Sequence, residues 1–215
     1  MGAPRNLQGT RHDVSATELP VDVDVLREEI QKTYTEVSTD PGSDFIFPTG
    51  RAWAQELAYP EEELASVPDE TVDSFAGVAN PWVLGRIDSG ATVLDLGCGA
   101  GTDLLIAAQM TGSSGMVIGI DMTPSMLERA RQSAERMGLT NVEVHEALIE
   151  TLPMPDASVD VVTSNGVIDL VPDKDAVFNE IDRVLRPGGR LQIADVVIHE
   201  EVSEDARKRI DLWTG

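Results

Sequence analysis

The sequence contains little cysteine, few basic residues and no long apolar run. Its single cysteine, Cys98, excludes an internal disulfide and a cysteine-based metal cluster, so we expect no metal site. Lys and Arg number 16 against 38 Asp and Glu, and the formal net charge is −22. This balance disfavours nucleic acid and anionic membranes as partners, because both are bound through basic side chains.

Targeting and membrane signals are also missing. No apolar run approaches the length that spans a bilayer, and the first twenty residues lack the apolar centre of a signal peptide. We therefore expect a cytoplasmic protein that acts on a small molecule, with no nucleic acid and no membrane among its partners.

The chain is long enough for one full-sized domain with a small appendage. Residues 1–20, rich in Gly, Pro, Thr and Asn, predict a flexible tail. Residues 21–90 predict a helical N-terminal cap, because apolar residues recur at helical spacing from Val21 to Tyr34 and shorter helical segments follow. Residues 91–215 then predict the main domain.

In the main domain, short apolar runs alternate with helical segments. The runs are Thr92–Leu96, Met116–Asp121, Val142–Ala147, Val159–Asn165 and Arg190–Ile198. The helical segments between them are Leu104–Met110, Pro124–Met137 and Lys174–Leu185. Strands that are apolar on nearly every residue are typical of a sheet covered on both faces. The pattern predicts an α/β fold with a doubly wound, mostly parallel sheet.

The stretch "VLDLGCGAGTD" places a glycine loop directly after the first predicted strand. Gly97, Gly99 and Gly101 give a G-x-G-x-G spacing, which lets the backbone pass close to a ligand. A dinucleotide fingerprint would be G-x-G-x-x-G, and that spacing is missing. Asp95 and Asp103 flank the loop and would repel a pyrophosphate. The pattern therefore predicts a ligand with a positive centre.

The second predicted strand ends in "GIDM", which places Asp121 where an acid would accept hydrogen bonds from both hydroxyls of a ribose. A nucleoside with a cationic tail fits Asp121 together with the acids beside the glycine loop. S-adenosyl-L-methionine, which carries a ribose, an ammonium and a sulfonium, is the predicted cofactor.

Four stretches, "VLDLGCGAGTD", "VIGIDMTPSMLERAR", "IETLPMPDASVDVVTSNGVIDL" and "EIDRVLRPGGRLQIADVV", resemble successive motifs of class I S-adenosylmethionine-dependent methyltransferases. The resemblance is strongest to the arsenite methyltransferase-like branch, and it implies a Rossmann-like fold with a seven-stranded sheet. It places Asp121 and Met122 at the ribose and adenine, and Asn165 near the methionine end. The implied cofactor-binding residues are Asp95, Gly97, Cys98, Gly99, Gly101, Asp121, Met122, Leu148, Ile149, Glu150 and Asn165.

The sequence defines less clearly the side of the site that would bind the methyl acceptor, called the acceptor side below. The sulfonium methyl is already electrophilic, so a soft nucleophile held in line needs no general base. Candidate residues on the acceptor side are Tyr34, Asn165, Asp169 and Asp195. For Asp169 and Asp195, a capping or solvated role explains the residues at least as well as a catalytic one. His145 fits a strand position, and His199, just past the fifth strand, is a further candidate acid or base.

The chain departs from the arsenite methyltransferases at their thiolate ligands, which suit a soft, thiophilic ion. Gly166 stands where that family shows a cysteine, Asp169 replaces an Asn, and Ala76 occupies another candidate cysteine position. Cys98 lies in the cofactor loop, where a small packing residue is expected. We therefore expect a methyltransferase for a small molecule other than arsenite.

Two alternatives stay open. One is a non-catalytic S-adenosylmethionine-binding fragment, and the other is an NAD-dependent dehydrogenase, against which the glycine spacing counts. Because five strands are recognisable and the family's sheet has two more, we also expect the domain to be truncated at the C-terminus. The edge of the fifth strand would then be unpaired.

Overall fold

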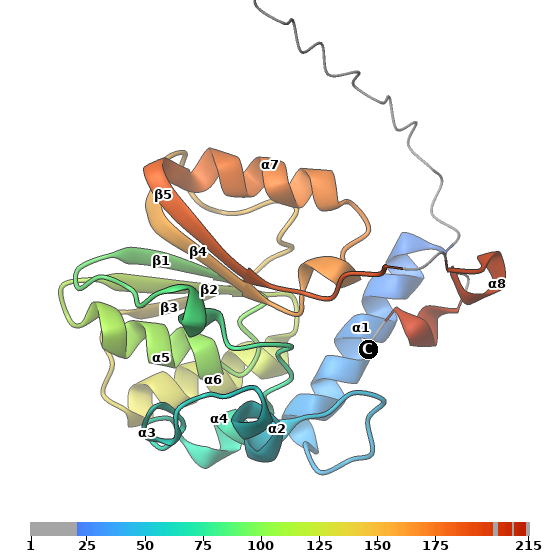
Figure 1. Cartoon of the computed structure of the whole chain (residues 1–215), viewed down its shortest axis with the longest axis horizontal. Helices are drawn as coiled ribbons and strands as arrows, with labels where there is room; N and C mark the ends of the chain where they lie inside the picture. Colours follow the sequence, from blue (N-terminus) through green and yellow to red (C-terminus); the bar gives the residue numbers. More distant parts are fainter. Residues whose placement is uncertain (1–20, 200–201, 208, 214–215) are drawn as a thin grey trace, which may run out of the picture.

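A parallel five-stranded sheet in the order β3-β2-β1-β4-β5 forms the centre of the computed structural model (Figure 1). The structure describes residues 21–199, 202–207 and 209–213, so the predicted tail 1–20 lies outside the described residues. The strands are β1 (Thr92–Leu96), β2 (Met116–Asp121), β3 (Val142–Glu146), β4 (Val159–Asn165) and β5 (Leu185–Ala194). The predicted doubly wound parallel sheet is confirmed.

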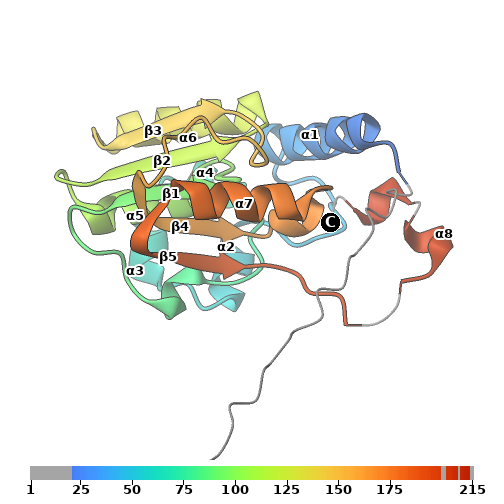
Figure 2. The same ribbon diagram turned by 90° about the horizontal axis from the view of Figure 1, so that it is seen from above.

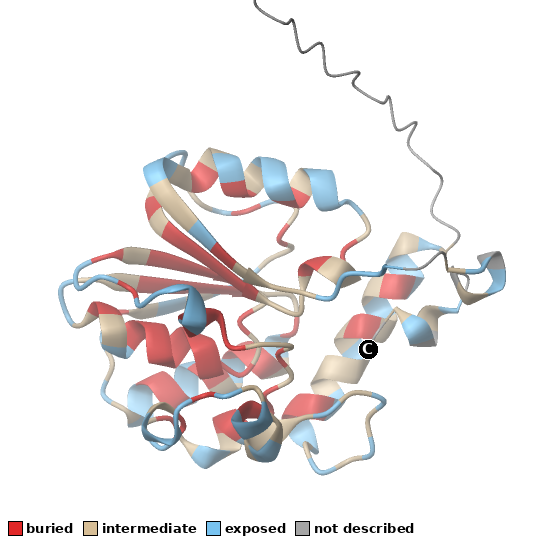
Figure 3. Cartoon of the chain, in the orientation of Figure 1, coloured by how far each residue is buried: buried red, intermediate tan, exposed pale blue. Residues whose placement is uncertain are grey.

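Helices cover both faces of the sheet. Helices α5 (Thr102–Thr111) and α6 (Pro124–Arg136) lie on one face, and α7 (Lys174–Val184) lies on the other (Figure 1). Two apolar clusters separate the layers, and Figure 3 shows the buried residues concentrated in β1, β2, β4 and the helix faces that pack on them. Strand β1 lies between β2 and β4, so strand order reverses there. A crevice is expected at that point, beyond the carboxyl ends of the strands.

The strand β3 corrects one expectation. The apolar run predicts a strand covered on both faces, but Glu143, His145 and Glu146 are exposed and the two valines are half-buried. Strand order explains this pattern, because β3 lies at the edge of the sheet and pairs with β2. The alternating apolar and polar residues of "VEVHE" are typical of such a half-covered strand.

The strand β5 differs from its prediction at both ends. It begins at Leu185 and ends at Ala194, which pairs with Asn165. Within the described structure no strand pairs with the apolar residues that follow, and Val197 and Ile198 are 69% and 70% exposed. Within the described part of the chain β5 pairs with β4 alone, so it forms the second edge of the sheet. The predicted truncation stays a prediction.

The residues before the sheet are helical. They form α1 (Val23–Thr39), α2 (Gly50–Glu56), α3 (Glu61–Leu64), α4 (Asp69–Asp73) and the 3-10 helix η1 (Pro81–Leu84). The Asp22 carboxylate caps α1 by accepting the N–H groups of Asp24 and Val25 at 2.9 and 3.2 Å. The helix predicted from Val21 to Tyr34 therefore exists and continues to Thr39.

Helix α1 lies at one end of the sheet (Figure 2). It packs on α6 and lies beyond the carboxyl ends of the strands (Figure 2). Residues of α2 and the segment after it, such as Ala54 and Tyr59, share one apolar cluster with Leu104 and Leu105 of α5. The division into a cap of residues 21–90 and a domain of residues 91–215 stays a prediction.

The remaining short elements are η2 (Ile168–Leu170), α8 (Glu204–Arg207) and η3 (Ile210–Leu212). Among the described residues, none of the helices has the length and apolar character needed to cross a bilayer.

Candidate functional site

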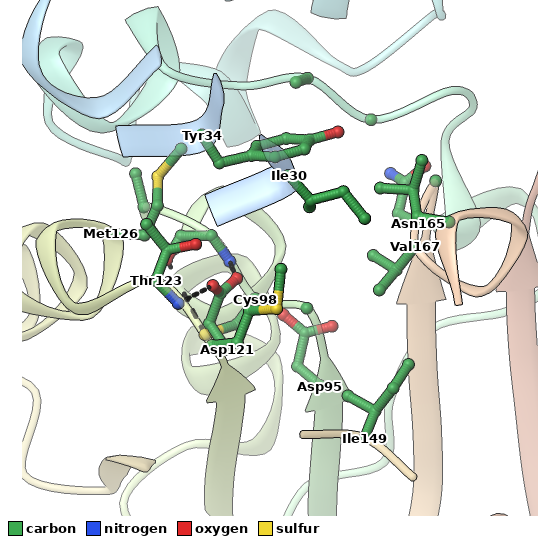
Figure 4. Close-up of a pocket in the computed structure, with 18 of the residues that line it drawn as sticks. Ile30, Tyr34, Asp95, Cys98, Asp121, Thr123, Met126, Ile149, Asn165 and Val167 are labelled. Atoms are coloured by element: carbon green, nitrogen blue, oxygen red, sulfur yellow. Dashed lines mark hydrogen bonds between the residues drawn. The ribbon is translucent and has the colours of Figure 1, made fainter. Parts of the chain in front are cut away.

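A cleft lies at the carboxyl ends of the strands, between α1 and the loops that follow β1, β2, β3 and β4 (Figure 4). The structure brings the predicted cofactor-binding residues together in its wall. These are Asp95, Gly97, Cys98, Gly99, Gly101, Asp121, Met122, Leu148, Ile149, Glu150 and Asn165, and Tyr34 lines the cleft as well. The binding roles of these residues stay predictions. Residues that the sequence analysis missed also line it, among them Arg27, Ile30, Phe75 and Val167.

The glycine loop turns β1 into α5 through left-handed backbone. Gly97 has φ +63°, and a Cβ there would lie 2.4 Å from Cγ2 of Val167. Gly99 has φ +51°, yet a Cβ there would meet no atom closer than Sδ of Met126 at 4.0 Å. Gly97 is therefore required for close packing, whereas Gly99 leaves open space on the side of the cleft.

Asp121, at the end of β2, fixes the glycine loop. Its Oδ2 accepts the N–H of Gly99 at 2.9 Å, and its Oδ1 accepts the N–H of Thr123 at 2.8 Å (Figure 4). Burial raises the pKa of Asp121, and these N–H donors oppose the rise. Each carboxylate oxygen keeps a second lone pair, so the side chain can still accept hydrogen bonds from a ligand.

Two further acids, Asp95 and Asp103, are buried in the cleft wall and are only 3% and 8% exposed. Burial, followed by the charge of Asp103, raises the pKa of Asp95 to about 8. Burial raises the pKa of Asp103 to about 6. Among the described residues, no Lys, Arg or His forms an ion pair with Asp95, Asp103 or Asp121. An acidic wall without a paired base favours a cationic ligand.

The raised pKa of Asp95 makes the stability of the ligand-free protein depend on pH. Between its ordinary pKa near 4 and the folded value of about 8, the unfolded chain releases a proton that the folded chain keeps. The stability that the folded chain gains from this retained proton is fully present below about pH 4 and is lost as pH rises toward 8. Urea unfolding at pH 5 to 8 should therefore show Asp95→Asn gaining stability relative to the parent as pH rises. The exposed Asp182→Asn is the control, and a pH-independent difference for Asp95→Asn would contradict the assignment.

Asn165, at the end of β4, has both of its side-chain groups engaged. Its Oδ1 accepts the N–H of Val78 at 2.8 Å, and its Nδ2 donates to Ala79 O and to Asp103 Oδ2, both at 2.9 Å. The Tyr59 hydroxyl donates to the other oxygen of Asp103 at 2.8 Å. Asn165 therefore ties the segment before η1 to β4 and orients Asp103.

Tyr34 borders the cleft from α1. Its ring stacks on Phe47 with centroids 5.8 Å apart. Figure 4 shows the hydroxyl directed toward the side of Asn165 and Val167, and among the described residues it has no hydrogen-bond partner. Burial and the charge of Asp169 raise the pKa of Tyr34, so the hydroxyl stays protonated and can donate.

Asp169 and Asp195 do not line the cleft. Asp195 lies one residue past β5, not within a strand as expected, and accepts the N–H groups of Ile168 and Asp169 at 3.0 and 3.2 Å. Burial and the neighbouring Asp195 raise the pKa of Asp169 to about 7. Asp195 thus caps the turn at η2, and an acceptor-side role for either acid stays a prediction.

The two histidines of interest also lie apart from the cleft. His145 is an exposed residue of β3 with Nε2 3.6 Å from Glu143 Oε2, and His199 is exposed beyond β5. Neither imidazole lines the cleft.

Cys98 packs inside the protein. A Cβ at Gly119 would lie only 2.7 Å from its Sγ, so the thiol fills the space that this glycine leaves. Burial, followed by the charge of Asp121, raises the pKa of Cys98 and keeps the thiol neutral. Ala76 and Gly166 line the cleft without a ligating atom.

A family model described as a methyltransferase domain matches residues 87–214. The chain belongs to this family, and the predicted Rossmann-like class I methyltransferase fold is confirmed. S-adenosylmethionine is the cofactor that this membership implies.

Within the family, the predicted likeness to arsenite methyltransferases is confirmed. The arsenite methyltransferase of Halobacterium salinarum is 43% identical over 167 residues, covering 78% of this chain and 42% of the relative. That of Rattus norvegicus is 35% identical over 164 residues, covering 72% and 44%. The solved structure of CrArsM, an arsenic(III) S-adenosylmethionine methyltransferase from Chlamydomonas reinhardtii, matches with a TM-score of 0.57 and 34% identity, covering 74% of this chain and 53% of that one. The chain thus spans less than half the length of these curated relatives.

Proposed function

We propose that this chain binds S-adenosyl-L-methionine in the cleft and transfers its methyl group to a small-molecule acceptor in the cytoplasm. The observation that carries the proposal is the cleft wall itself. A glycine loop with open space at Gly99 adjoins three acidic side chains, Asp95, Asp103 and Asp121, none of which has an ion-pair partner among the described residues. A ligand with a ribose and a positively charged tail complements this wall.

The cofactor supplies an activated methyl group on sulfur. Asp121 would hold the ribose, while Met122, Leu148 and Ile149 would enclose the adenine. Ile30 and Tyr34 of helix α1 border the cleft and would shield the reacting atoms from water (Figure 4). The protein then needs only to align the nucleophile with the bond that breaks, which is the step that positioning accelerates.

The acceptor would enter beside Tyr34 and the turn after β4. Tyr34 has a free hydroxyl at this side of the cleft within the described structure, whereas the amide of Asn165 is fully engaged in holding Asp103 and the segment before η1. Tyr34 is therefore the stronger candidate for a residue that contacts the acceptor.

Calorimetry with S-adenosylmethionine, S-adenosylhomocysteine and NAD tests cofactor binding. We expect the first two to bind and NAD to fail, because the acidic wall repels a pyrophosphate. Transfer of a labelled methyl group to a panel of thiols, amines, phenols and arsenite then separates an enzyme from a non-catalytic binding module. Binding of NAD alone would identify a dehydrogenase instead.

Arsenite itself is expected to bind weakly and to support no turnover. The sequence has one cysteine, and its buried, neutral thiol packs against Gly119. Thiolates are the ligands that a soft ion of this kind prefers. Arsenite titration of the chain and of Cys98→Ser should give the same weak signal. Tight binding lost in Cys98→Ser would overturn the packing role of Cys98, and arsenite-dependent methyl transfer would overturn the exclusion of this acceptor.

A further inference from the structure

Helix α1 contacts the cleft wall through polar groups on one face. Arg27 Nη2 pairs with Glu150 Oε1 at 2.9 Å, and Gln31 Nε2 donates to Met122 O at 2.7 Å. Arg27 and Gln31 are one helical turn apart, so both reach the same side. Their partners follow β3 and β2 and lie in the region assigned to the adenine. The helix thus contacts this subsite directly.

The ion pair with Arg27 engages only one of the two carboxylate oxygens of Glu150. Its side chain is 12% exposed, and it lines the cleft together with Arg27. Oε1 is held by the guanidinium, whereas Oε2 has no hydrogen-bond partner among the described residues. A carboxylate has acceptor sites on both oxygens, so Oε2 can accept a further donor while Oε1 stays paired.

Arg27 is suited to fixing a carboxylate. Its guanidinium is planar and always charged, and it forms directional hydrogen bonds to carboxylate oxygens. The side chain is 33% exposed, yet its Nε is buried and has no partner within the described structure. Without the guanidinium, the Glu150 side chain would be free to rotate toward water, since no other described residue bonds to it.

We propose that Arg27 is a positioning residue for adenine recognition: by holding Oε1 of Glu150, it presents Oε2 to the exocyclic amino group of the adenine. The inference rests on the proposed S-adenosylmethionine site and extends it to α1, which none of the sequence motifs includes. Arg27 acts through Glu150, so its removal should reduce selectivity for the amino group and not only overall affinity.

The test compares S-adenosylhomocysteine with S-inosylhomocysteine, in which a keto oxygen replaces the amino group. The parent chain should prefer the adenine ligand by roughly tenfold, the ratio for one charge-assisted hydrogen bond. Arg27→Ala and Glu150→Ala should each bring the ratio of the two ligand affinities close to one. The double variant should lose no more of the adenine preference than either single variant does. Arg27→Lys keeps the charge without the planar fork and should restore part of the preference.

Arg86→Ala is the matched control. It breaks an ion pair of similar length, Arg86 Nη1 to Glu63 Oε1 at 3.0 Å, between residues that do not line the cleft. Its preference should equal that of the parent, and thermal unfolding of every variant confirms that the fold persists.

The outcomes are distinct. If the parent chain binds neither ligand, the proposed function fails before this inference is tested. If the parent binds with an adenine preference and Arg27→Ala lowers affinity for both ligands equally, Arg27 merely holds the helix in place and the inference is wrong. An unchanged preference in Arg27→Ala refutes it as well.

Discussion

Replacing Gly99 with valine should weaken S-adenosylmethionine binding by roughly a hundredfold or more. The space beside Gly99 is open toward the cleft, and a Cβ at this position would lie 4.0 Å from Met126 Sδ, so a branched side chain would occupy volume that the cofactor needs. The backbone at φ +51° adds strain for a β-branched residue, on the order of 1–3 kcal/mol.

The strain and the lost space can be separated with a second glycine. Gly138 has φ +66°, and a Cβ there would meet nothing within 4 Å. Gly138→Val therefore carries a comparable backbone cost away from the cleft. We expect both variants to lose thermal stability and only Gly99→Val to lose binding in calorimetry. Normal cofactor affinity in a folded Gly99→Val would show that this loop does not enclose the cofactor.

Much of the fold could be predicted because its signals are local. The strand, the glycine loop and the helix are encoded in one continuous stretch from Thr92 to Thr111, so the predicted ends of β1 and α5 lie within two residues of the observed ones. Apolar density alone could not show that the run after Ala194 leaves the sheet. That outcome depends on β4 ending at Asn165, with Gly166 turning away at φ +69°.

The glycine loop and Asp121 were likewise accessible to sequence reasoning, because parallel strands deliver their carboxyl ends to one edge. On the α1 side of the cleft, sequence reasoning indicated Tyr34 but not the polar contacts of Arg27 and Gln31. Arg27 and Glu150 are 123 residues apart, and Gln31 and Met122 are 91 apart. The amphipathic pattern of α1 predicts a buried face but does not identify the surface that it covers.

The same limit applies to Asn165. The resemblance places it near the methionine end of the cofactor, which stays a prediction, but it does not indicate that the amide bonds to Asp103, Val78 and Ala79. Tyr59 completes this network from 44 residues before Asp103, and no spacing in the sequence indicates that pairing. Buried polar groups find partners wherever the fold supplies them, so their partners follow from tertiary packing and not from motif position.

Replacing Asp121 with alanine should weaken S-adenosylmethionine binding by about 1.5–3 kcal/mol, the range for losing a charged hydrogen-bond acceptor. Two separate effects contribute to this loss. The carboxylate is assigned to the ribose hydroxyls, and it also accepts the N–H groups of Gly99 and Thr123. Alanine would leave both N–H groups without their acceptor and loosen the glycine loop.

A ligand comparison separates the ribose contact from the loop contact. The parent chain and Asp121→Asn, which keeps one acceptor oxygen and the side-chain volume, are titrated with S-adenosylhomocysteine and with its 2′,3′-dideoxyribose analogue. If Asp121 accepts hydrogen bonds from the ribose, the parent should prefer the hydroxylated ligand, and Asp121→Asn should lose most of that preference. If instead both ligands lose affinity by the same factor in Asp121→Asn, the carboxylate acts through Gly99 and Thr123 alone. Unchanged affinity for S-adenosylhomocysteine in Asp121→Ala would remove this residue from the cofactor site altogether.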